Sequence, residues 1–170
     1  MRALLIAALL ATPAFATDGP VFMGFGTHTP VEYDVVIPKG MVLRHVYDVT
    51  AATPGKRNPG FETAARFINS HVANGMAERD VAVAVVVHGP AINELTKSAV
   101  YAARQNGAAN ASQAMVEDML KKGVRFVVCG QAANMMGVKK SDLLPGVELA
   151  ISASSAHAIL QAQGYTVNPF

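Results

Sequence analysis

Two polar residues that end apolar runs are the strongest candidates for chemistry in this sequence. His88 ends the run VAVAVVVH, and Cys129, the only cysteine in the chain, ends the run VRFVVC. A thiolate attacks sulfur or binds soft metal ions, and an imidazole exchanges protons near neutral pH. The residues after Cys129 read GQAANMMGV and predict a short helix. Because the amino end of a helix stabilises negative charge, this position favours a reactive thiolate.

Both residues also have an inert interpretation. Cys129 is explained equally well as a buried thiol, and His88 as a histidine that bonds a loop carbonyl. If the residues are active, Cys129 is the nucleophile and His88 assists proton transfer. Gly89, Gly130 and Gln131 are then expected to bind the substrate, because Gly130 carries no Cβ and would let a sulfur atom or an anion approach closely.

Metal binding is a further possibility at the same place. Met135 and Met136 follow Cys129 closely, and thiolate with thioether suits Cu(I), although a pair of methionines in a short helix is also typical of core packing. His28, His45, His71 and His157 show no metal-ligand spacing and are expected to be structural or exposed. Neither a Cys-x-x-Cys motif, a phosphate-binding loop nor a dinucleotide fingerprint is present, so no cofactor is expected.

The first residues indicate export. The segment MRALLIAALLATPAFA has the charge, apolar run and small-x-small site of a secretory signal, so residues 1–16 are expected to be removed by cleavage after Ala16. The mature protein would then reside in a periplasm. A single cysteine excludes an intramolecular disulfide and leaves an inert, reactive or intermolecular thiol. Residues 17–40, rich in Gly and Pro, predict an irregular N-terminal arm with a short extended piece at 31–37.

Elements of alternating type follow from residue 41 and would position His88 and Cys129. Strands are expected at 41–50, 81–87, 124–129 and 147–152, with a final short strand in 165–170. Helices are expected at 61–75, at about 92–105, from a cap at Asn110 or Ser112 to Gly123, at 130–136, and from a cap at Ser154 or Ser155 to Gly164. The sequence therefore predicts an α/β domain over residues 41–170, a flavodoxin-like, mainly parallel sheet with helices on both faces.

Composition excludes one class of partner. The formal net charge is only +2 and 15% of the residues are charged, without the basic face that nucleic-acid binding needs. No segment after the signal predicts a membrane span. We therefore expect neither nucleic acid nor membrane as a partner of the mature chain.

Three segments together resemble the DsrE/DsrF-like family, including its small YchN-like members. They are VAVAVVVHGPAINEL, MVEDMLKKGVRFVVCGQAANMMGV and LLPGVELAISASSAHAILQAQGY, and the similarity runs from about Met41 to Tyr165. The resemblance implies a flavodoxin-like sheet and a homotrimer or homohexamer. It also implies, for some members, relay of sulfane sulfur as a persulfide on the cysteine that is Cys129 here. Other members lack this cysteine and serve as structural partner subunits.

The resulting interpretation is a periplasmic sulfur carrier or sulfurtransferase-like protein that holds sulfane sulfur as a persulfide on Cys129. Its partners would be sulfur donor and acceptor proteins or small sulfur compounds. One alternative is a non-catalytic binding or assembly module of the same fold, in which Cys129 is merely buried. Another is a Cu(I)-binding protein that uses Cys129 and the nearby methionines. Whether the chain is an enzyme remains open at this point.

Overall fold

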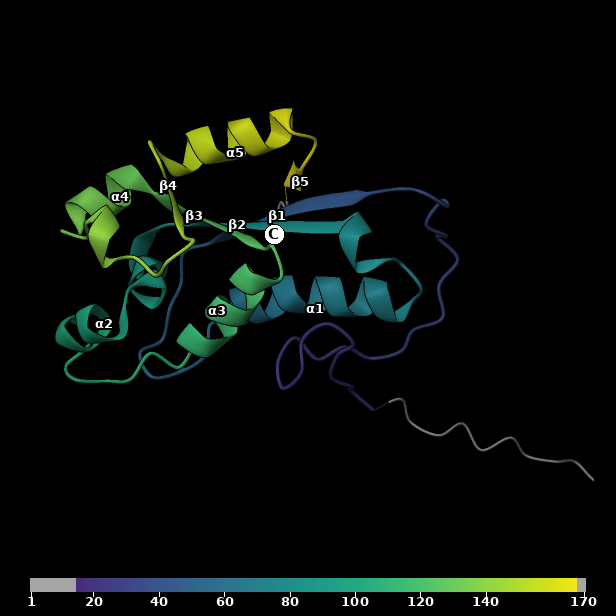
Figure 1. Ribbon diagram of the computed structural model, residues 1–170, viewed down its shortest axis with the longest axis horizontal. Helices are drawn as coiled ribbons and strands as arrows, with labels where there is room; N and C mark the ends of the chain where they lie inside the picture. Colours follow the sequence, from purple (N-terminus) through teal and green to yellow (C-terminus); the bar gives the residue numbers. More distant parts are fainter. Residues whose placement is uncertain (1–14, 168–170) are drawn as a thin grey trace, which may run out of the picture.

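A five-stranded parallel sheet forms the centre of the protein (Figure 1). The computed structural model describes residues 15–167. The strands are β1 (Leu43–Val49), β2 (Val81–Val87), β3 (Arg125–Cys129), β4 (Glu148–Ala150) and β5 (Thr166–Val167). Their order across the sheet is β4-β3-β2-β1-β5, and every pairing is parallel. The predicted α/β, flavodoxin-like class is confirmed, although this strand order differs from that of flavodoxin itself.

Helices cover both faces of the sheet (Figure 1). They are α1 (Pro59–Ala73), α2 (Ser98–Arg104), α3 (Gln113–Lys121), α4 (Gly130–Met135) and α5 (Ala153–Ala162), with 3-10 turns η1 (Glu78–Asp80), η2 (Gly89–Leu95) and η3 (Lys140–Asp142). On one face α1 and α3 pack against alternate strand residues such as Val85 and Phe126. On the other face α5 buries Leu160 against Val86 and Val127.

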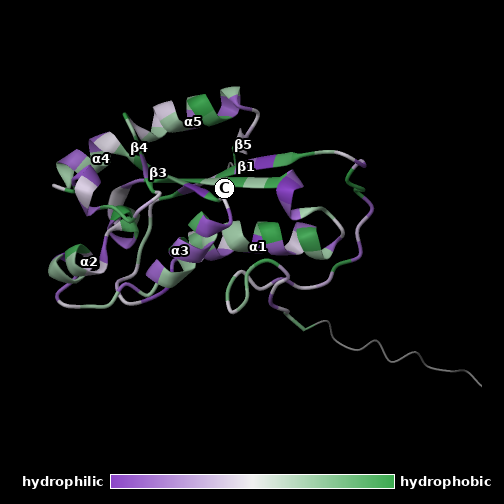
Figure 2. Ribbon diagram, in the orientation of Figure 1, coloured by the Kyte–Doolittle hydropathy of each residue, from purple (hydrophilic) through white to green (hydrophobic). Residues whose placement is uncertain are grey.

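Strand β2 shows why an unbroken apolar run folds as a central strand. Successive side chains point to opposite faces, so Val83 and Val85 enter the α1 side while Ala84 and Val86 enter the α5 side. Figure 2 shows this strand in the hydrophobic colour, whereas α1 alternates between hydrophobic and hydrophilic. An amphipathic helix on each side thus requires a strand that is apolar on both faces.

The single helix predicted for residues 92–105 is wrong. The chain forms η2 and then α2, because backbone groups at the junction of the two helices form hydrogen bonds with the segment before β4. Leu95 O accepts from Leu144 N at 2.9 Å, and Lys97 N donates to Asp142 O at 2.8 Å. These bonds remove backbone groups from a continuous helix and tie the segment to the turn before β4.

The predicted cap of α5 is wrong, whereas the cap of α3 is at a predicted residue but makes different hydrogen bonds. The cap of α5 is Ser152, three residues before Ser155, and the two serines form a reciprocal capping box. Ser112 precedes α3 as expected, but its hydroxyl donates to Glu94 and accepts from Asn58 N instead of capping the helix. Buried polar partners therefore outweigh the local cap at this position.

The segment before the sheet is partly anchored to α1. Phe22 and Phe25 lie in the core, and the buried side chain of Asn69 accepts from the N–H groups of Val21 and Phe22 at 3.1 and 2.9 Å. Its amide also donates to three backbone carbonyls of the same segment. Residues 31–37 form no strand, contrary to the expected extended piece.

The expected signal lies mostly outside the described residues, since the structure describes the chain from residue 15 onward. Within residues 15–167, every helix is too short or too polar to cross a bilayer.

Candidate functional site

Cys129 lies at the carboxyl ends of the neighbouring strands β3 and β4, whose following helices, α4 and α5, pack on opposite faces of the sheet. It is the last residue of β3 and the N-cap of α4, and its Sγ accepts a hydrogen bond from the N–H of Ala132 at 3.5 Å. Helix α4 contributes Ala133 to the core on the α1 side, whereas α5, which follows β4, packs on the other side. Ligands of open α/β sheets bind at such a switch point, beyond the carboxyl ends of the strands.

The thiol is nevertheless well covered, with only 7% of Cys129 exposed. Backbone packing at the neighbouring Gly130 contributes to this closure. A Cβ on Gly130 would lie 2.4 Å from Ala150 O and 3.2 Å from Ile151 O, and Gln131 N donates to Ile151 O at 3.2 Å. The start of α4 and the end of β4 are therefore in direct contact, and Gly130 is the residue that lets them meet.

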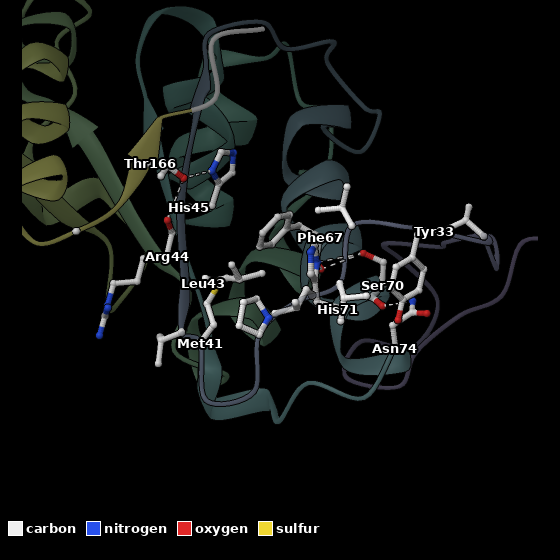
Figure 3. Close-up of a pocket in the computed structure, with 17 residues that line it drawn as sticks. Tyr33, Met41, Leu43, Arg44, His45, Phe67, Ser70, His71, Asn74 and Thr166 are labelled. Carbon is white, nitrogen blue, oxygen red and sulfur yellow. Dashed lines mark hydrogen bonds between the residues drawn. The ribbon is translucent and has the colours of Figure 1, made fainter.

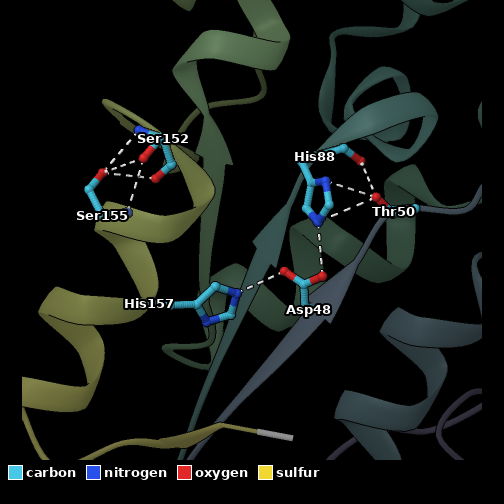
Figure 4. A network of polar contacts seen from close by, with 6 residues as sticks. All are labelled: Asp48, Thr50, His88, Ser152, Ser155 and His157. Atoms are coloured by element: carbon cyan, nitrogen blue, oxygen red, sulfur yellow. Dashed lines mark hydrogen bonds and ion pairs between the residues drawn. The ribbon is translucent and has the colours of Figure 1, made fainter. Parts of the chain in front are cut away.

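Asp48, at the carboxyl end of β1, joins two histidines from different elements (Figure 4). Its Oδ2 accepts from Nε2 of His88 at 2.9 Å, and its Oδ1 accepts from Nε2 of His157 at 2.8 Å. The second ring nitrogen of His88, Nδ1, lies 2.9 Å from Oγ1 of Thr50. One carboxylate thus links β1, the residue after β2, and helix α5.

Burial and hydrogen bonding oppose each other at Asp48. Partial burial alone would raise the pKa of its carboxyl, but the hydrogen bonds from His157 and His88 and the charges of these rings outweigh that effect and lower it. Asp48 is therefore ionised at neutral pH and can hold both imidazoles in fixed orientations.

Strand register relates this cluster to Cys129. Val87 pairs with Val128, so His88 and Cys129 take the next positions on adjacent strands. Side-chain alternation assigns Asp48, His88 and Cys129 to the sheet face that α5 covers, the face of Val86 and Val127. Among the described residues no hydrogen bond joins the thiol to His88, because both ring nitrogens of His88 face Asp48 and Thr50.

The other predicted site residues have distinct surroundings. Gly89 has a φ of 59°, and a Cβ there would meet Thr50 Oγ1 at 3.3 Å, so it brings the start of η2 close to the end of β1. The side chain of Gln131 is exposed on α4. Met135 is 87% exposed, whereas Met136 packs against the core on the α1 side.

Sequence reasoning missed Asp48 and assigned His157 a structural or exposed role. The signal for Asp48 was weak, a charged residue two positions before the end of a strand that alternates apolar and polar residues. His157 is distant in sequence, and only the placement of α5 brings it to Asp48. In residues 15–167 no group of three or more His, Cys, Asp or Glu side chains is arranged to hold a metal ion.

Glu94 forms a second polar cluster, in the connection after β2. It is 1% exposed, accepts from Ser112 Oγ at 3.2 Å and from Asn58 Nδ2, and its backbone carbonyl accepts from Asn110. Burial raises the pKa of this carboxyl, and the hydrogen bonds from Asn58 and Ser112 oppose that rise. Glu94 therefore fixes the connection that follows His88.

Comparison with known proteins places the chain in a family. No curated protein matches it. Among solved structures, the protein of unknown function MTH1491 from Methanobacterium thermoautotrophicum is 23% identical, with a TM-score of 0.49, covering 74% of this chain and 97% of that one. The profile of the DsrE/DsrF-like family matches residues 46–169, which include the second half of β1, strands β2 to β5, Cys129 and the Asp48 cluster. The chain belongs to the DsrE/DsrF-like family.

Proposed function

We propose that the protein is an exported sulfur carrier that holds sulfane sulfur as a persulfide on Cys129. The observation that carries this proposal is the position of the thiol at the switch point, with Sγ accepting the N–H of Ala132. Transfer chemistry uses the thiolate as the nucleophile, and at this position the sulfur lies against a backbone N–H group at the start of a helix.

The transfer step is an exchange at sulfur. The Cys129 thiolate attacks the terminal sulfur of a donor persulfide R–S–SH, a new S–S bond forms, and the donor's S–S bond breaks. The donor leaves as the thiolate R–S⁻, and the proton of the terminal sulfur stays with it in Cys129–S–SH. A partner thiolate then removes that sulfur by the same exchange. Sulfur donors and acceptors, either proteins or small sulfur compounds, are the partners this cycle needs.

Mass spectrometry of the intact protein tests the proposal. After incubation with glutathione persulfide, the wild-type chain should gain the mass of one sulfur atom, which dithiothreitol then removes. Cys129→Ser should gain none, because it lacks the single thiol of the chain. A wild-type protein that gains no sulfur, or a serine variant that keeps the label, would overturn the proposal.

A non-catalytic binding or assembly module is the second candidate, favoured by one observation. Only 7% of Cys129 is exposed, so a donor reaches the sulfur only if its surroundings move. Titration with a thiol reagent separates the two functions. Reaction of the native protein within minutes supports the carrier, whereas reaction only after denaturation supports the module.

We also propose that the protein assembles as a homotrimer or homohexamer in the periplasm. Supporting this, β4 is an edge strand with Leu149 39% exposed, and Ile151, just beyond it, is 79% exposed. Exposed apolar residues on an edge strand favour contact with another chain. Sedimentation velocity of the wild type and of Ile151→Lys tests the assembly, and fractionation of cells that express the full chain tests the export.

A further inference from the structure

Figure 3 shows a cavity of about 800 Å³ that lies where β1 and β5 begin, whereas Cys129 lies at the carboxyl end of the parallel strand β3. Its walls come from residues 31–38, from residues 41–45 at the start of β1, from the last turns of α1, and from Gly164 and Thr166 near β5. This volume is within the range of small-molecule sites, about 300–1,000 Å³. The cavity is thus separate from the thiol and is unrelated to the sulfur chemistry proposed above.

Aromatic rings form one wall of the cavity. Phe67 on α1 lies between two imidazoles, with its ring centroid 5.3 Å from that of His45 and 4.1 Å from that of His71. Apolar side chains from the arm and from β1 supply much of the remaining lining, including Val35, Val36 and Leu43. A flat apolar ring is the ligand shape that such a wall favours.

The two histidines present hydrogen-bond acceptors. Nδ1 of His71 lies 2.6 Å from the carbonyl oxygen of Phe67, which can only accept, so Nδ1 carries the proton. Nδ1 of His45 lies 2.7 Å from Thr166 Oγ1, whose own proton goes to the carbonyl of Arg44. Nδ1 of His45 is therefore also the donor. When either ring is neutral its lone pair is therefore on Nε2, to which no group in residues 15–167 donates.

The charge of the lining favours a neutral ligand. Arg44 is the one residue of the lining with a permanent charge, and Figure 3 shows its side chain directed away from the histidines. Burial, and secondarily the proximity of His71, lowers the pKa of His45. At neutral pH the cavity therefore offers His45 as an uncharged acceptor and places no fixed cation beside it to hold a carboxylate.

We propose that this cavity binds a neutral, mainly apolar ring compound that carries a hydroxyl or N–H group. The ring packs against the wall of Phe67, His45 and His71 and on the valines of the arm. The hydroxyl or N–H donates to Nε2 of His45 or His71. Binding would also cover Val35 and Val36, which are 87% and 73% exposed.

Three naphthalenes that differ in one group test this assignment against the mature full-length chain. Isothermal titration calorimetry at pH 7.5 should show saturable binding of 1-naphthol with one site per chain. Naphthalene, which lacks the donor, should bind about 2- to 10-fold more weakly, the effect of one neutral hydrogen bond. 1-Naphthoate, an anion with the same ring, should bind more weakly than 1-naphthol.

Variants identify the acceptor. The double variant His45→Phe/His71→Phe keeps flat rings but removes both Nε2 lone pairs, so the preference for 1-naphthol over naphthalene should fall to about onefold. His28→Phe, a histidine outside the cavity, should keep the wild-type preference, and circular dichroism establishes that each variant is folded. Absence of saturable naphthol binding, equal affinity for naphthol and naphthalene in the wild type, or an unchanged preference in the double variant would overturn the proposal. So would sedimentation data in which His71→Phe dissociates an oligomer, since a second copy would then occupy the cavity.

Discussion

Gly130→Ala tests how closely α4 and β4 meet beside the thiol. The new Cβ would lie 2.4 Å from Ala150 O and 3.2 Å from Ile151 O. Ordinary carbon–oxygen contacts begin at about 3.3 Å, so the backbone at the end of β4 must move by about 1 Å. Gly130 has no positive φ, so steric contact alone drives the change.

The expected loss of stability follows from two opposing effects. Overpacking at a closely packed site typically costs about 1–3 kcal/mol. Alanine is a better helix former than glycine by up to about 1 kcal/mol, and Gly130 is the first residue of α4. We therefore expect a net loss of about 1–2 kcal/mol and a melting temperature lower by about 2–8 °C.

Urea unfolding followed by far-ultraviolet circular dichroism measures this loss, since the chain has no tryptophan to report by fluorescence. The reaction rate of the native thiol should rise in the same variant, because separation of α4 from β4 uncovers Cys129. Gln131→Ala, an exposed change on the same helix, is the matched control and should alter neither quantity appreciably. A Gly130→Ala protein within about 0.5 kcal/mol of the wild type, with unchanged thiol reactivity, would refute the contact.

Three further substitutions test buried and polar contacts. The stability of the wild type is expected to decline as pH rises above about 4.5, and Glu94→Gln should remove this decline. Because burial raises the pKa of Glu94, ionisation of this carboxyl in that pH range costs more in the folded than in the unfolded state. Melting temperatures of wild type and variant that change in parallel from pH 4 to 7 would contradict this. Asn69→Ala should lower stability by about 2–3 kcal/mol and speed proteolysis of residues 17–28, because five backbone hydrogen bonds are lost; equal cleavage rates would count against it. Asp48→Asn should cost at most about 1 kcal/mol, because solvent screens its pairs with His88 and His157, and the difference should vanish as pH falls through the lowered pKa of Asp48; a larger loss that persists at low pH would exclude this origin.

Local sequence pattern was sufficient for much of the fold. The apolar run of β2 identified a strand covered on both faces, and Gly75, Gly123 and Gly164, all with positive φ, follow helices where the sequence predicted. Each of these features depends on neighbours within a few residues. The sequence also identified the cysteine at the end of β3, because a strand and a helix meet there.

Features that depend on distant residues could not be predicted in this way. The break between η2 and α2 arises from bonds to Asp142 and Leu144, some fifty residues further along the chain. His157 meets Asp48 only because α5 crosses the face of the sheet. Asn69 accepts a hydrogen bond from the N–H of Phe22, a residue far away in the sequence. Helical periodicity alone does not explain why an asparagine occupies this buried position of α1. In each case a long-range polar contact outweighs the local signal.

The hydrogen bonds of His88 bear on whether this ring can take a proton from Cys129. Nδ1 of His88 faces Thr50 and Nε2 faces Asp48, so the ring accepts no thiol proton unless one of these contacts breaks. In this arrangement the sulfur of Cys129 contacts the N–H of Ala132 at the start of α4 and forms no hydrogen bond with the His88 ring. Access to the sulfur relies on the contact between Gly130 and β4. If Gly130→Ala accelerates thiol reaction and Asp48→Asn does not, then access rather than proton removal limits the chemistry of this thiol. If instead Asp48→Asn accelerates the reaction and Gly130→Ala does not, then His88, once released from Asp48, acts as the base that removes the thiol proton.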